Sequence, residues 1–119
     1  MEKVTGIGGV FFRSRDPEFL AAWYRDNLGV DPISEGFWKQ EAGHTVFAPF
    51  ASDTEYFGRP DQQWMINFRV SDLNAMRAQL ARSGIESETR DEWDTPETGR
   101  FARLHDPDGN PIELWEPPH

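Results

Sequence analysis

The chain has 119 residues, enough for one compact domain with its own core but too few for two independent domains. Its formal net charge of -9 would repel a phosphate backbone, so we expect no nucleic-acid partner. It has no cysteine for disulfides or thiolate metal sites and no apolar stretch of the roughly 18 residues that span a membrane, so we expect a cytoplasmic protein with no membrane partner.

The N-terminal segment 7–13 predicts a strand. Side chains alternate between the two faces of a strand, so Val10 and Phe12 share one face. The opposite face carries Gly9, Phe11 and Arg13.

A helix is predicted directly after this strand. Asp16 is a good N-cap and Pro17 suits the first helical position. Leu20 and Tyr24 fall on one apolar stripe, and Gly29 ends the helix.

The next part of the chain gives weaker signals. Short strands are predicted near Ile33, at 37–40 and at 45–50. Residues 51–63 contain glycine, proline and several polar residues, and predict a connecting loop.

Residues 64–70 predict a second strong strand. One face carries Trp64, Ile66, Phe68 and Val70, and the other carries Met65, Asn67 and Arg69.

A second helix is predicted after this strand, capped by Ser71 or Asp72 and ended by Gly84. Residues 85–90 predict a weak strand and residues 91–100 a loop.

The last segment, 101–117, predicts a hairpin. Asp106 to Asn110 concentrate Asx residues, a proline and a glycine, which favours a tight turn. After the turn, Ile112 and Leu114 share one face, and Glu113 and Trp115 share the other.

The two halves repeat the same order of strand, capping Asp, amphipathic helix and Gly. Aligning the halves pairs Arg13 with Arg69. Aligning Gly43 with Gly109 then pairs Phe47 with Glu113. We interpret each half as one module.

The sequence DPDG at 106–109, followed by IEL at 112–114, resembles the glyoxalase/bleomycin-resistance/extradiol-dioxygenase superfamily, also called vicinal oxygen chelate proteins. The resemblance implies an α+β fold in a single domain spanning 1–119. Two βαβββ modules, at about 5–58 and 62–117, would form an eight-stranded cupped mixed sheet with the helices on its convex side and one small-molecule cavity.

The family's metal ligands would fall on Gly9, Phe47, Met65 and Glu113, all on the concave face. Glu113 alone could bind a hard or borderline divalent ion, because a thioether is a soft, weak donor. We therefore expect no cofactor and no complete metal site. A divalent metal would need an improvised site, in which His105 could join Glu113, and His105 could also act as a base. The alternative is that His105 only hydrogen-bonds near the hairpin.

Three arginines share the predicted concave face, Arg13, Arg69 and Arg103, and guanidinium groups suit carboxylate ligands. Alternatively, Arg13 and Arg69 only pair with the nearby helix-capping aspartates. The other predicted ligand-binding residues are Phe11, Phe47, Met65, Asn67 and Trp115.

Two functions stay open. The first is a bleomycin-resistance-like protein that binds a small anionic or aromatic molecule without a metal. The second is a glyoxalase-like lyase, isomerase or dioxygenase that uses Glu113 as base or metal ligand. We also expect a homodimer, because a cupped sheet leaves strand edges to cover, and the modules could pair within one chain or between chains. Glu113 is expected to behave as a surface-like carboxylate that folding does not need.

Overall fold

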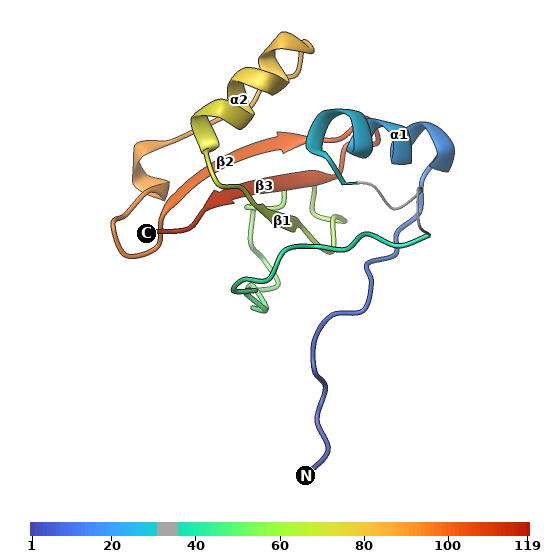
Figure 1. Ribbon diagram of the computed structural model, residues 1–119, viewed down its shortest axis with the longest axis vertical. Coiled ribbons are helices and arrows are strands. Elements are labelled where there is room, and N and C mark those ends of the chain that lie inside the picture. The colour runs from blue at the N-terminus through green and yellow to red at the C-terminus, as the bar shows by residue number, and fades with distance from the viewer. Residues whose placement is uncertain (31–35) are drawn as a thin grey trace.

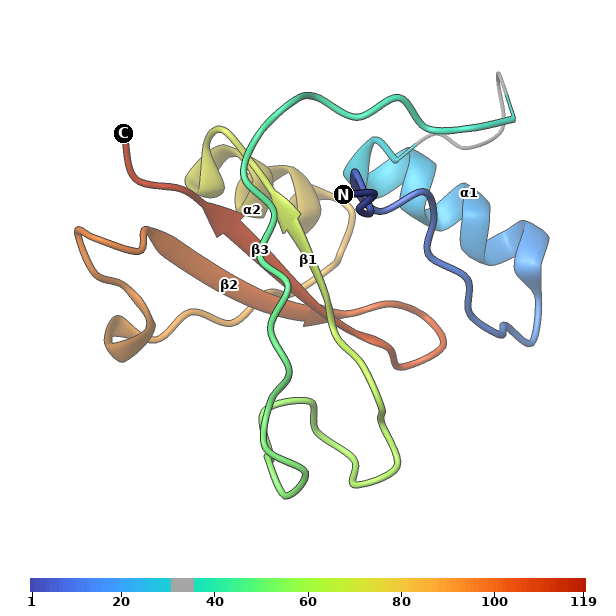
Figure 2. The same cartoon turned by 90° about the horizontal axis from the view of Figure 1, so that it is seen from below.

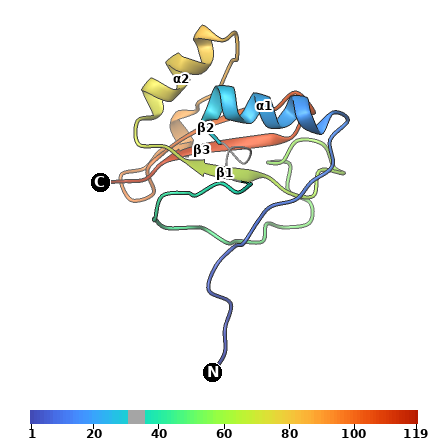
Figure 3. The same cartoon turned by 45° about the vertical axis from the view of Figure 1, so that its right-hand side comes forward.

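The computed structural model describes residues 1–30 and 36–119. Both helices lie on one face of a small sheet, and the segment from residue 36 to residue 63 runs across the other face (Figure 1, Figure 3). We call this second face the open face. The elements in chain order are α1 (Pro17–Leu28), β1 (Ile66–Arg69), α2 (Leu73–Arg82), the 3-10 helix η1 (Asp91–Trp93), β2 (Arg100–His105) and β3 (Pro111–Glu116).

The two helices begin and end where the sequence predicts. Asp16 accepts a hydrogen bond from the backbone N–H of Phe19 at 3.2 Å, and Asp72 accepts one from that of Ala75 at 2.9 Å. Gly29 ends α1 with a φ of 74°, a left-handed conformation that favours glycine. None of the helices in the described ranges is both long and apolar enough to cross a membrane.

Strand β3 lies in the middle of the sheet, between β1 and β2 (Figure 2). It pairs parallel with β1, where Ile66 faces Ile112, and antiparallel with β2, where Leu104 faces Ile112. The predicted C-terminal hairpin is therefore confirmed, and the strand predicted at 64–70 is present as the shorter β1.

The core lies between the helices and the sheet. It contains alternate residues of the strands, because every second side chain of a strand points to the same face. Its buried members are Leu20 and Tyr24 from α1, Leu73 and Leu80 from α2, Ala102 and Leu104 from β2, and Ile112 and Leu114 from β3.

A buried carboxylate organises the turn between β2 and β3. Asp106 is only 5% exposed, and it accepts backbone hydrogen bonds from Asp108 at 2.8 Å and Asn110 at 2.9 Å. The side-chain amide of Asn110 and the hydroxyl of Tyr24 donate to its other oxygen, at 2.8 and 2.7 Å. The same side chain thus shapes the turn and anchors α1.

The eight-stranded sheet is not confirmed, since the described residues form three strands. The segments 7–13, 37–40 and 45–50 are not assigned as strands, and the prediction near Ile33 lies outside the described residues. In the predicted weak strand at 85–90, Glu88 forms an isolated bridge with Arg103. Alternation favours an extended conformation, but a strand also needs a hydrogen-bonded neighbour.

Candidate functional site

Three polar side chains form one row across the open face. Asn67 of β1 and Arg103 of β2 each lie opposite Glu113 of β3 in the strand register. They alternate with core residues of the same strands, so they point away from the helices. The structure thus brings together three of the residues that the sequence analysis selected.

The Glu113 carboxylate is paired on both oxygens. Asn67 donates to Oε1 at 2.8 Å, and the hydroxyl of Tyr56 donates to Oε2 at 2.5 Å. Glu113 is also half-buried. The expectation of a surface-like carboxylate is therefore wrong.

Tyr56 reaches Glu113 from the segment that crosses the open face. Its ring stacks on Phe50 with centroids 6.0 Å apart, and it forms a T-shaped pair with Trp93, also with centroids 6.0 Å apart. Burial, and next the hydrogen bond to Glu113, raise the pKa of the Tyr56 hydroxyl above its usual value, so the phenol stays protonated at neutral pH. We call the whole group the Glu113 cluster, and its members are Phe50, Tyr56, Asn67, Trp93, Arg103 and Glu113.

Arg103 supplies the cationic side of the cluster. Its guanidinium carbon lies 4.6 Å from the centre of the Tyr56 ring, a cation–π distance. Its Nε is buried, and among the described residues it has no hydrogen-bond partner. A buried donor without a partner carries a cost of about 1–3 kcal/mol, so this nitrogen offers a ligand an unsatisfied donor.

Arg69 has a different role from the one predicted. We call residues 36–63, which cross the open face, the covering segment. The Arg69 guanidinium donates to two backbone carbonyls of this segment, those of His44 at 2.5 Å and Glu41 at 2.7 Å. A Cβ on Gly43 would lie 2.8 Å from the Arg69 guanidinium carbon, so the segment approaches this side chain closely. Arg69 does not pair with Asp72 either. The Asp72 carboxylate instead caps α2 by accepting a hydrogen bond from the backbone N–H of Ala75.

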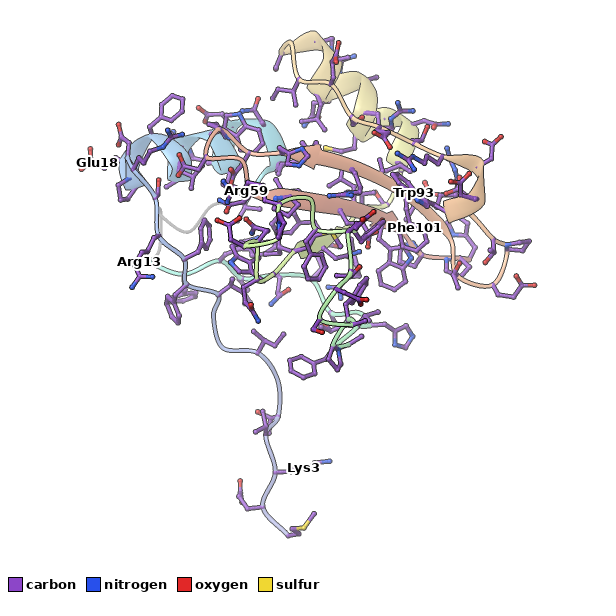
Figure 4. The ribbon with its side chains drawn as sticks, turned by 180° about the vertical axis from the view of Figure 1, so that it is seen from behind. Lys3, Arg13, Glu18, Arg59, Trp93 and Phe101 are labelled. Atoms are coloured by element: carbon purple, nitrogen blue, oxygen red, sulfur yellow. The ribbon has the colours of Figure 1, made fainter. Side chains whose placement is uncertain are left out.

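The first-half residues that the sequence analysis selected lie outside the Glu113 cluster. Phe11 and Phe47 are 93% and 88% exposed. Arg13 lies on the N-terminal segment, well apart from Trp93 (Figure 4), and lines an open hollow of about 560 Å³ together with Arg59 and other residues.

The remaining predicted residues surround the row on the strands. Trp115 stacks on Phe101 with centroids 6.4 Å apart, and its indole N–H donates to the carbonyl of Thr98 at 2.7 Å. Met65 is half-buried just before β1. His105 is exposed at the end of β2, where it lines a groove of about 570 Å³ together with Arg103 and other residues.

At the positions that the family resemblance implies, the described side chains do not fit a divalent metal. Gly9, Phe47 and Met65 bring no hard donor to the positions that the family resemblance implies, and both Glu113 oxygens already accept hydrogen bonds. Within residues 1–30 and 36–119, no group of three or more His, Asp or Glu side chains is placed to hold an ion.

The sequence analysis missed Phe50, Tyr56 and Trp93. Tyr56 and Trp93 lie in segments predicted as loops, where no periodic pattern marks a side chain as inward-facing. The available signal was the aromatic content, with five Trp, nine Phe and two Tyr, which exceeds what a small core readily hides.

Comparison with known proteins gives a match to a family model and matches to solved structures. The family model described as "Glyoxalase-like domain" matches residues 9–115. A similar solved structure is that of TnmS3, an antibiotic binding protein from Streptomyces sp. CB03234, with 27% sequence identity, a TM-score of 0.50, and coverage of 86% of this chain and 87% of that chain. No curated protein matches the chain.

Proposed function

The chain belongs to the glyoxalase-like domain family, and on this premise we propose that it binds a small anionic or aromatic molecule on the open face, without a complete metal site. The family and the similarity to an antibiotic binding protein both support a binding function of the bleomycin-resistance type. The observation that carries the proposal is the Glu113 cluster, in which aromatic rings surround one paired carboxylate and one unsatisfied guanidinium nitrogen.

The cluster suits a flat ligand with a polar group. Phe50 and Trp93 offer ring surfaces, Asn67 and Glu113 offer hydrogen-bonding groups, and Arg103 offers a positive charge. Met65 and Trp115 extend this surface along the strands.

We expect residues of the first half to complete the pocket. Phe11, Arg13 and Phe47 would reach the ligand once their segments pair as strands, either within the chain or with a second copy. The exposure of both phenylalanines supports this, because strand pairing would cover them. The expected homodimer is tested by sedimentation at micromolar concentration, where a monomer would contradict it.

A thermal-shift screen of matched aromatic acids and amines tests ligand class. We expect acids to stabilise the protein more than the matched amines do, Arg103→Ala to remove this difference, and the exposed control Arg82→Ala to preserve it. Arg69→Ala tests whether Arg69 also contacts the ligand. If amines stabilise the protein and acids do not, the ligand is cationic.

One observation keeps an enzyme as the second candidate. A carboxylate hydrogen-bonded to a phenol can accept and return a proton, so Glu113 could act as the base of a lyase, isomerase or dioxygenase. Metal analysis of protein purified without a histidine tag separates the candidates. Stoichiometric zinc, nickel, manganese or iron would favour the enzyme.

A further inference from the structure

Tyr56 already fills the central position of the Glu113 cluster. Its hydroxyl donates to Glu113 and its ring covers the Arg103 guanidinium. Its ring contacts the same aromatic side chains, Phe50 and Trp93, that the proposed ligand would use. A ligand can therefore enter this position only if Tyr56 leaves it.

Tyr56 sits on a segment that can move without breaking the sheet. The backbone hydrogen bonds found in residues 51–63 are local turns, such as Thr54 to Ala51 and Gly58 to Glu55. No residue of this segment pairs with β1, β2 or β3 in the described structure. Displacing Tyr56 would therefore break its own side-chain contacts but none of the hydrogen bonds between strands.

We infer that Tyr56 occupies the ligand's own place, and that the ligand is a neutral hydroxylated aromatic molecule. Its hydroxyl would replace that of Tyr56 on Glu113, and its ring would replace the Tyr56 ring over Arg103. This inference rests on the proposed function and narrows its ligand class.

Charge at the cluster supports a neutral ligand. A carboxylate placed on Glu113 would meet a like charge, and an ammonium placed over Arg103 would do the same. A phenol-type hydroxyl avoids both conflicts, because it donates to the carboxylate while its ring faces the cation.

The test uses three bicyclic probes on the full chain, measured by tryptophan fluorescence. 2-Naphthol has a donor hydroxyl, 2-methoxynaphthalene lacks the donor, and 2-naphthoate carries a negative charge. They are titrated into the wild type, Tyr56→Ala, Tyr56→Phe and the exposed control Phe19→Ala, each checked for cooperative thermal unfolding.

We expect Tyr56→Ala to bind 2-naphthol about tenfold more tightly than the wild type, because a competitor for the site is gone. Tyr56→Phe keeps the ring but loses the hydrogen bond to Glu113, so its affinity for 2-naphthol should lie between those of the wild type and Tyr56→Ala. If Tyr56→Ala fails to fold, the comparison of Tyr56→Phe with the wild type serves as the test. The control Phe19→Ala should bind 2-naphthol with the same affinity as the wild type. Both other probes should bind Tyr56→Ala more weakly than 2-naphthol does.

Two results would overturn the inference while leaving the proposed function in place. One is 2-naphthoate binding as tightly as 2-naphthol, and the other is 2-naphthol binding equally to the wild type and both Tyr56 variants. If none of the probes binds any variant, the proposed function fails as well, because the open face would then hold no aromatic ligand.

Discussion

The hydroxyl of Tyr24 donates a 2.7 Å hydrogen bond to the buried carboxylate of Asp106, although the two residues are 82 positions apart in the sequence. The bond joins helix α1, from the first half of the chain, to the turn of the C-terminal hairpin. It is a buried contact to an ionisable group, the kind of hydrogen bond that contributes most to stability.

Removing this hydroxyl should destabilise the protein. In Tyr24→Phe, Asp106 keeps its three donors within the turn but loses the link to α1, so we expect the free energy of unfolding to fall by about 2 kcal/mol. Urea denaturation followed by circular dichroism measures the change. Tyr56→Phe is the matched control for the loss of a phenol hydroxyl, and an unchanged midpoint for Tyr24→Phe would show that the bond contributes nothing.

Both tyrosines of the chain should resist ionisation in alkali. Burial, followed by the bond to a carboxylate, raises the pKa of Tyr24 and of Tyr56 above the ordinary value of 10.0. Above pH 10 the unfolded state releases two protons that the folded state retains, so the free energy of unfolding falls as the pH rises. Absorbance of phenolate should therefore appear together with unfolding, and Tyr24→Phe should halve its amplitude. A separate phenolate signal near pH 10 from folded protein would contradict the prediction.

Arg69 should hold the covering segment against the sheet. Arg69→Ala removes both of its bonds to backbone carbonyls, and Gly43→Ala forces a Cβ against the guanidinium. Either change should speed cleavage by a lysine-specific protease, because Lys39 lies close to Glu41 and the only other lysine is Lys3.

The control for this experiment is Arg59→Ala. Arg59 is exposed and, within the described part of the chain, pairs only with nearby Asp61 and Gln62, so its loss should leave the cleavage rate at Lys39 unchanged. Equal rates for the wild type and Arg69→Ala would mean that the two carbonyl contacts do not restrain the segment.

Glu113→Gln should cost some stability. The amide oxygen can still accept from Tyr56, but the charge that strengthens both hydrogen bonds is lost, so we expect a decrease of about 1 kcal/mol in the free energy of unfolding. Thermal unfolding at neutral pH measures it. A melting temperature equal to that of the wild type would show that folding does not need the Glu113 carboxylate, as the sequence analysis expected.

Local signals predicted the second half of the chain well. Asp72 and Gly84 mark the ends of α2, and the turn residues between Asp106 and Asn110 mark the hairpin, because each acts on neighbours a few positions away. Alternation also placed Asn67, Arg103 and Glu113 on one face, since a strand needs only its own sequence to define its two sides.

Contacts across long separations could not be predicted in this way. Tyr56 and Glu113 are 57 positions apart, and the segment around Tyr56 has no repeating pattern that would show which side chain points inward. The segments 7–13 and 45–50 present the converse case. Both are predicted as strands, but a strand forms only beside a hydrogen-bonded neighbour, and the sequence of a segment does not show whether it has one.

The hydrogen bonds of Asp106 separate the DPDG turn from the proposed ligand site. All four donors to its carboxylate belong to the protein itself, and none lies in the Glu113 cluster. Mutations in the Glu113 cluster could therefore alter the proposed ligand site while the turn, and the architecture it supports, stays intact. An engineer could redesign that site without altering the turn.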